Sequence, residues 1–313
     1  GSLRLDGFLD KLLDLAIYHS NSNSFTGGIP AIPASRIKYL YELDLSNNNY
    51  FGSFPVSVLL AQKLSYLDIR FNAFNGSLPE DVLKLKLDVL FLNNNYFDGA
   101  IPPNVGSSPA YYINFANNYF SGTIPNTIGE APNLLEILFL NNQLTGCLPY
   151  EIGKLKELIV FDAGDNYLTG PIPLSFVCLT KLEQLNLASN QLYGTVPEDL
   201  CLIKTLANIS LSNNYFTQVG SACRKLIDMN KLDLRNNCVL DLPGQRGSHE
   251  CEEFFRKSSS CPNELSLRDI PCQMSSNEAA PAQQRRGHTS FAKVTSSGET
   301  TYLTYNALRP AHG

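Results

Sequence analysis

The sequence predicts an α/β solenoid of about ten repeats of 23–25 residues, closed at its C-terminal end by a disulfide-bonded cap. Three observations predict this fold. An asparagine recurs at that interval, apolar residues precede it at a fixed spacing, and all eight cysteines lie at or after residue 147. The repeated asparagines are Asn23, Asn48, Asn72, Asn95, Asn118, Asn142, Asn166, Asn190, Asn214 and Asn237.

Each repeat begins with a short predicted strand. The clearest copy runs Leu182-x-x-Leu185-x-Leu187-x-x-Asn190, and its alternating leucines match a strand with one buried face. One such unit cannot bury its apolar edge alone, so neighbouring units must stack into a continuous core. Because the asparagine follows where the chain leaves the strand, we expect its amide to be buried and to bond the backbone of the turn.

The second half of most repeats ends in Gly-x-Ile-Pro or a close variant, as in residues 120–125 and 168–173. Glycine permits a tight bend, and proline ends local hydrogen bonding. The whole pattern is that of a leucine-rich repeat. Its ending resembles the plant extracellular class of these repeats, which is found in receptor kinases, polygalacturonase inhibitors and leucine-rich repeat extensins.

The regularity of the pattern divides the chain into four parts. Residues 1–39 form a degenerate N-terminal unit, and residues 40–237 form the solenoid. Residues 238–272 form a cysteine-rich cap with a short helix over 250–257. Residues 273–313 are rich in Ser, Ala and Thr without periodicity, so we expect a disordered tail.

Composition excludes several classes of function. The net charge of −5 and the pI of 5.4 argue against nucleic acid as a partner, because such proteins carry clustered Lys and Arg. Apolar runs stay well below the ~18 residues of a membrane span. The sequence holds neither a Gly-x-Ser-x-Gly nor a His-Glu-x-x-His motif, and we expect no catalytic residue and no cofactor.

The cysteines indicate disulfides and therefore an oxidising, extracellular compartment. A metal site is disfavoured, because no Cys-x-x-Cys pair occurs and His249 is the only histidine nearby. The cysteines are Cys147, Cys178, Cys201, Cys223, Cys238, Cys251, Cys261 and Cys272. Candidate pairs are Cys201–Cys223, Cys238–Cys251, Cys261–Cys272 and, across adjacent coils, Cys147–Cys178, but spacing alone leaves the connectivity open. Asn75 and Asn208 begin glycosylation sequons, which fit secretion.

Four segments resemble leucine-rich repeat extensins more closely: residues 15–25, 67–72, 141–149 and, most specifically, 237–251. The resemblance covers about residues 8–255. An extensin-type N-terminal cysteine cap and Ser-Pro repeats are missing, so the chain is similar to relatives that omit the extensin part. The resemblance implies a secreted, cell-wall-associated, non-catalytic domain. It implies a small basic cysteine-rich peptide of alkalinization-factor type as ligand, and the capacity to form a homodimer.

Strand side chains between the buried leucines are expected to face outward on the concave side of the solenoid. There they form an aromatic centre flanked by carboxylates. Rigid rings supply contact area and acids orient a basic partner, so this face suits a basic peptide. The predicted peptide-binding residues are Asp44, Tyr66, Asp68, Phe71, Phe91, Tyr112, Glu136, Asp162 and Asp165.

Two other functions remain open on the sequence alone. By analogy with the related repeat class, the chain could inhibit a cell-wall polysaccharide-degrading enzyme. A row of tyrosines after the consensus asparagines, Tyr96, Tyr119, Tyr167 and Tyr215, could instead stack on wall polysaccharide or simply cover the edge of the coil.

Overall fold

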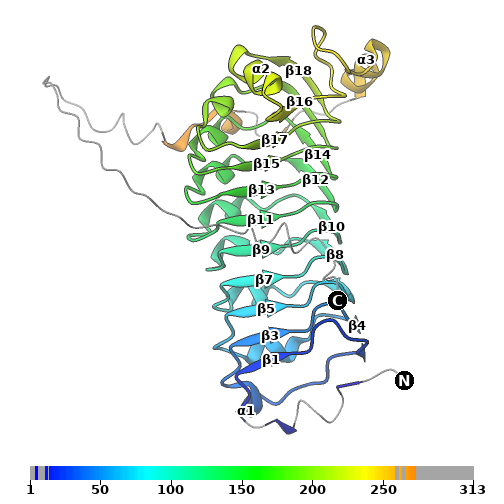
Figure 1. The fold of residues 1–313 in the computed structure, drawn as a ribbon, viewed down its shortest axis with the longest axis vertical. Helices are drawn as coiled ribbons and strands as arrows, with labels where there is room; N and C mark the ends of the chain where they lie inside the picture. Colours follow the sequence, from blue (N-terminus) through cyan, green and yellow to red (C-terminus); the bar gives the residue numbers. More distant parts are fainter. Residues whose placement is uncertain (1–3, 6–10, 13, 258–260, 263–264, 273–313) are drawn as a thin grey trace, which may run out of the picture.

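The computed structural model describes residues 4–5, 11–12, 14–257, 261–262 and 265–272. These residues form an elongated stack of coils in which the strands of successive repeats run side by side (Figure 1). The predicted leucine-rich repeat solenoid is therefore confirmed. The tail expected over 273–313 lies outside the described residues.

Two parallel sheets run the length of the stack, and each repeat except the last contributes one strand to each sheet. The first sheet contains β1 (Ile17–His19), β3 (Glu42–Asp44), β5 (Tyr66–Asp68), β7 (Val89–Phe91), β9 (Tyr112–Asn114), β11 (Glu136–Leu138), β13 (Val160–Asp162), β15 (Gln184–Asn186), β17 (Asn208–Ser210) and β19 (Leu232–Asp233). The second contains β2 (Thr26–Gly27), β4 (Asn49–Gly52), β6 (Ala73–Ser77), β8 (Tyr96–Ala100), β10 (Tyr119–Gly122), β12 (Gln143–Cys147), β14 (Tyr167–Gly170), β16 (Gln191–Val196) and β18 (Tyr215–Val219).

Short helices complete the coils. Most are 3₁₀ helices of five residues that begin directly after a proline, in keeping with the short runs typical of 3₁₀ geometry. They are η2 (Val56–Leu60), η3 (Glu80–Lys84), η4 (Val105–Ser107), η5 (Asn126–Glu130), η6 (Tyr150–Lys154), η7 (Leu174–Cys178), η8 (Glu198–Leu202) and η9 (Ser266–Arg268). The α-helices are α1 (Ala34–Ile37), α2 (Ser221–Asp228) and α3 (Ser248–Lys257).

The helix predicted over 250–257 is confirmed as the greater part of α3.

The core lies between the two sheets and the helical turns. Leucines of the first sheet and aromatic residues of the second fill it, and neighbouring repeats place similar rings in register. Tyr50, Phe74, Phe97 and Phe120 are buried, and the centroids of successive rings lie 6.2–6.3 Å apart.

The repeated asparagines bond the turns of adjacent coils, as predicted. Asn118 Nδ2 donates to the carbonyls of Phe115 and Leu92, each at 3.1 Å, and the Phe97 amide donates to Asn118 Oδ1 at 3.0 Å. One side chain therefore satisfies groups in its own coil and in the preceding one. Removing it would leave buried polar groups without partners.

Four disulfides involve all eight cysteines: Cys147–Cys261, Cys178–Cys272, Cys201–Cys223 and Cys238–Cys251. The last two confirm the prediction. The predicted pairs Cys261–Cys272 and Cys147–Cys178 are wrong. The segment that contains η9 returns along the stack and packs against η7, so its cysteines meet coils more than ninety residues earlier in the chain (Figure 1).

Candidate functional site

The predicted binding residues lie mainly in two rows that cross the first sheet. Strand pairing places Glu42, Tyr66, Val89, Tyr112, Glu136, Val160 and Gln184 in one row. It places Asp44, Asp68, Phe91, Asn114, Leu138, Asp162 and Asn186 in the other. The register predicted from period two is therefore confirmed, and seven of the nine candidates share this face directly with their row neighbours.

The Asp and Asn residues of the second row have a structural role at the strand end. Asp44 Oδ1 accepts the amide of Ser46 at 2.9 Å, and the same bond to the residue two positions on recurs along the row. The equivalent acceptors are Asp68, Asn114, Asp162, Asn186 and Asp233, at 2.9–3.1 Å. Because Asn serves as well as Asp, the strand-end bond requires a side-chain oxygen but no negative charge. Phe91 and Leu138 occupy the same row, so the fold does not need this bond in every repeat.

Tyr66, Asp68, Arg70 and Phe91 form a packed cluster on β5 and β7. The rings of Tyr66 and Phe91 meet edge to face with centroids 6.2 Å apart, and the Arg70 guanidinium lies 5.2 Å from the Phe91 ring centre. Arg70 Nε lies 3.1 Å from Asp68 Oδ2, and Tyr66 Oη donates to the same oxygen at 3.3 Å. Phe91 is only 3% exposed, so a ligand would meet mainly Tyr66 and Arg70.

Burial sets the protonation of this cluster. Asp68 is completely buried, and the loss of solvation raises the pKa of its carboxyl to about 7. Arg70 opposes that shift, and the neighbouring Asp44 adds to it. Burial likewise raises the pKa of Tyr66 and of Tyr112, with the charge of Glu136 contributing in the second case.

The middle of the sheet combines buried acids with an apolar cluster. Glu136 and Asp162 are almost completely buried beside Ala116, Leu138 and Val160. An acid in this setting is costly to desolvate unless it has partners. This part of the face therefore places two buried carboxyl groups next to an apolar surface.

Phe71 and Asp165 lie apart from the two rows. Both occupy the turn that follows the first sheet, with φ of 52° and 51°. Asn94, Asn117 and Asn141 occupy the same turn in other repeats. Asn tolerates this left-handed conformation, whereas Phe71 is an unusual occupant. These two candidates therefore line the edge of the sheet rather than its face.

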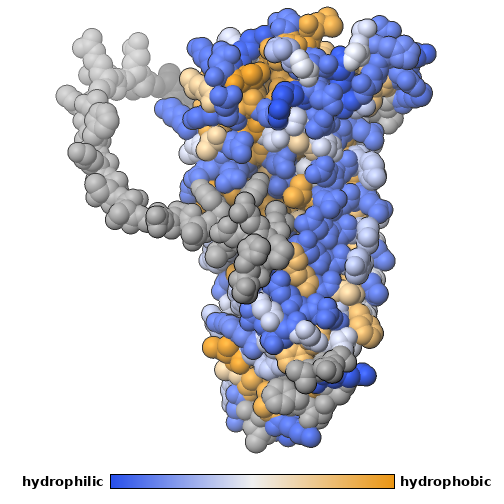
Figure 2. Space-filling model, turned by 45° about the vertical axis from the view of Figure 1, so that its right-hand side comes forward, coloured by the Kyte–Doolittle hydropathy of each residue, from blue (hydrophilic) through white to orange (hydrophobic). Residues whose placement is uncertain are grey.

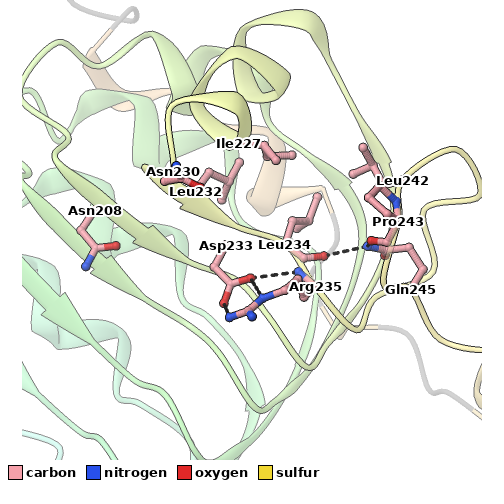
Figure 3. Close-up of a pocket in the computed structure, with 10 residues that line it drawn as sticks. All are labelled: Asn208, Ile227, Asn230, Leu232, Asp233, Leu234, Arg235, Leu242, Pro243 and Gln245. Atoms are coloured by element: carbon pink, nitrogen blue, oxygen red, sulfur yellow. Dashed lines mark hydrogen bonds and ion pairs between the residues drawn. The ribbon is translucent and has the colours of Figure 1, made fainter.

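A pocket of about 440 Å³ lies at the C-terminal end of the first sheet, and no predicted peptide-binding residue lines it (Figure 3). Its polar wall is the pair Asp233–Arg235, in which Arg235 Nη2 lies 2.8 Å from Asp233 Oδ2. The Arg235 guanidinium lowers the pKa of the Asp233 carboxyl. The sequon residue Asn208 is exposed at the rim, so a glycan there would lie over this pocket.

The edge of the second sheet forms a further surface. For its tyrosines the sequence left open whether they bind a ligand or only cover the coil. A groove of about 450 Å³ is lined by exposed tyrosines and by the asparagines of the turns. The signal in the sequence was the repeated Asn-Asn-Tyr-Phe pattern of Asn94 to Phe97 and Asn117 to Phe120. Whether these tyrosines form an open surface depends on which of their rings other side chains cover, and only the structure shows this.

Within the part of the chain that the structure describes, no three His, Cys, Asp or Glu side chains are grouped in a way that could hold a metal ion. None of the described helices is long and apolar enough to cross a membrane.

Comparisons with known proteins agree with the fold. The Leucine Rich Repeat family model matches residues 181–203. Receptor-like protein 32 of Arabidopsis thaliana is 40% identical over 65 residues, which are 20% of this chain and 7% of that protein. The chain is thus similar to plant receptor-like leucine-rich repeat proteins over short stretches.

Two solved plant ectodomains are similar over most of the chain. The ectodomain of the Arabidopsis thaliana receptor kinase GASSHO1/SCHENGEN3, in complex with CASPARIAN STRIP INTEGRITY FACTOR 2, aligns with a TM-score of 0.67 and 34% identity. The alignment covers 73% of this chain and 28% of that one. The Arabidopsis receptor kinase HAESA, in complex with the peptide hormone IDA and the co-receptor SERK1, aligns with a TM-score of 0.64 and 30% identity. That alignment covers 72% of this chain and 38% of the HAESA chain. The chain therefore spans well under half of either ectodomain.

Proposed function

We propose that this chain is a secreted, cell-wall-associated, non-catalytic repeat domain that binds a small basic cysteine-rich peptide of alkalinization-factor type on the first sheet. The similar ectodomain of HAESA was solved with a peptide hormone, which supports a peptide as the class of ligand. The four disulfides support an extracellular setting.

The observation that carries the proposal is the presence of carboxyl groups in the second row at positions where an amide would make the same bond. Asn114 and Asn186 make the same strand-end bond as Asp44 and Asp162, so the charge of these aspartates is not needed for folding. A carboxylate at a position where an amide suffices supports a role in attracting a cationic partner. Glu136 adds a further acid between them.

The aromatic cluster supplies the apolar part of the proposed contact. Tyr66 and Tyr112 are half-buried and lie two strands apart in the first row. Phe91 and Asp68 fix the Tyr66 ring, so a peptide would meet contact area there that loses little conformational freedom on binding. The cationic Arg70, held by Asp68, would limit binding to peptides whose positive charges avoid β5.

The test is isothermal titration calorimetry of the chain with a panel of basic cysteine-rich peptides. The informative variant is Asp44→Asn combined with Asp162→Asn, because each asparagine keeps the strand-end bond and removes only the charge. We expect the variant to bind about tenfold or more weakly, with an unchanged melting temperature.

Asp98→Asn is the matched control, because Asp98 is exposed on β8 of the second sheet. It should bind like the original chain. Absence of binding heat with every peptide would refute a peptide site on the first sheet. An equal loss of affinity in Asp98→Asn would refute it as well.

A further inference from the structure

A second surface runs along the edge where the coils turn into the second sheet. We call it the tyrosine edge and define it as Tyr96, Tyr119, Gln143 and Tyr167 with the turn residues Asn94, Asn117 and Asn141. The three tyrosines begin β8, β10 and β14 and are 51%, 49% and 55% exposed. Together with adjoining asparagines these residues line the groove of about 450 Å³. Figure 2 shows a mostly hydrophilic side of the molecule, with hydrophobic side chains in separate groups along its length.

The rings and amides of the tyrosine edge are ordered by the repeat. Tyr96 and Tyr119 stack with centroids 6.1 Å apart and planes at 13°. Asn141 Nδ2 donates to Asn117 Oδ1 at 2.9 Å, so the turn amides form their own line beside the rings. The groove thus offers flat aromatic faces and, next to them, groups that both donate and accept hydrogen bonds.

The chain itself shows two groups that pack on such a ring: the Phe254 ring and, 4.4 Å from the Tyr215 ring centre, the Arg246 guanidinium. Tyr215 occupies the equivalent first position of β18, and the ring of Phe254 from α3 lies flat on it, with centroids 3.6 Å apart and planes at 4°. Phe254 and Phe255 also contact Tyr193 of β16. The cap therefore covers the C-terminal end of the row with flat apolar rings, whereas Tyr96, Tyr119 and Tyr167 keep about half of their surface exposed.

The charged residues beside the groove limit the class of ligand that can bind there. None of the groove-lining residues is Lys or Arg, and the acids Asp98 and Asp165 lie beside the tyrosines on β8 and in the turn. A polyanion such as a polyuronate would be repelled there. A neutral ligand with a flat C–H face and hydroxyl groups around it would match both the rings and the amides.

We propose that the tyrosine edge binds an extended neutral oligosaccharide, with sugar rings stacked on Tyr96, Tyr119 and Tyr167 and hydroxyls bonded to the turn amides. The repeat places equivalent groups along the solenoid axis, so successive sugar rings of one chain would meet successive coils. This site is separate from the first-sheet face and does not depend on peptide binding.

The experiment titrates the full chain with cellohexaose and, separately, with hexagalacturonate. Tyrosine emission follows binding, because the chain contains no tryptophan; all fifteen tyrosines contribute, so the variants below assign the change to the tyrosine edge. We expect cellohexaose to bind and hexagalacturonate to bind more weakly. Tyr119→Ala should lower cellohexaose affinity by about three- to tenfold through loss of one stacking partner.

Two controls separate stacking from loss of folding. Tyr119→Phe keeps the ring and should retain most of the affinity. Tyr111→Ala removes another exposed tyrosine, one that precedes β9 and lies outside the groove, and should have no effect. The proposal is overturned if cellohexaose fails to bind, if hexagalacturonate binds more tightly, or if Tyr111→Ala weakens binding as much as Tyr119→Ala.

Discussion

At the residue scale, a side chain in this solenoid often serves the turn and the surface at once. The acids of the second row illustrate this, since Asp44 holds an amide that Asn114 holds equally well in another repeat. Sequence alone predicted which residues share the face, because strand alternation fixes it. It could not predict that Phe91 is buried, because that depends on Tyr66 and Arg70 packing over it.

The buried carboxyl of Asp68 predicts a pH-dependent stability. Its pKa is about 7 in the folded chain against an ordinary value of 3.8, so between these values the folded state binds the proton more tightly than the unfolded chain does. The corresponding stabilisation is fully present below pH ~4 and is lost as the pH rises through 7. We expect the unfolding free energy to fall by roughly 2–3 kcal/mol between pH 5 and 8 from this group.

Urea denaturation of the original chain and of Asp68→Asn at both pH values checks the effect. The variant lacks the titrating group but keeps a side-chain oxygen for the Arg70 amide, so its stability should depend less on pH. Identical pH dependence of the two chains would contradict the protonation of Asp68.

At the element scale, the sequence predicted a disulfide within a short segment but not one that forms because the chain turns back along the stack. Cys238–Cys251 closes a short segment and was foreseeable, whereas Cys147–Cys261 joins residues 114 positions apart. Nothing in the cysteine spacing encodes the return of the η9 segment along the coils. The helical turns were likewise shorter than a general α/β pattern implies: η5 spans five residues after Pro125.

The docking of that return segment depends on a glycine. Gly170 has φ of 86°, and a Cβ added there would lie 2.2 Å from Cys261 Sγ. We expect Gly170→Ala to destabilise the chain by about 1–3 kcal/mol more than Gly76→Ala, because overpacking adds to the cost of the left-handed backbone. Gly76 holds the matching repeat position with φ of 76° and has no atom within 4 Å of an added Cβ.

Urea denaturation of both alanine variants measures the difference, and non-reducing peptide mapping shows whether Cys147–Cys261 still forms. Equal destabilisation of the two variants, with this disulfide intact, would mean that the return segment does not pack against β14.

At the scale of the whole molecule, the solenoid separates two surfaces of different chemistry. The first sheet combines acids with half-buried aromatic rings, and the tyrosine edge combines open rings with uncharged amides. The overall fold was predictable because ten similar units repeat one pattern. The candidate surfaces were only partly predictable, because the covering of Tyr215 by α3 and the exposure of Tyr119 depend on how the cap packs.

Hydroxyl-radical footprinting with a bound basic peptide, read by mass spectrometry, tests the first-sheet site most directly. A peptide on the first sheet should slow the oxidation of Tyr66 and Tyr112 and leave Tyr39, which lies between Lys38 and Lys63, unchanged. Protection of Tyr39, or unchanged oxidation of Tyr66 and Tyr112 at saturating peptide, would contradict the account.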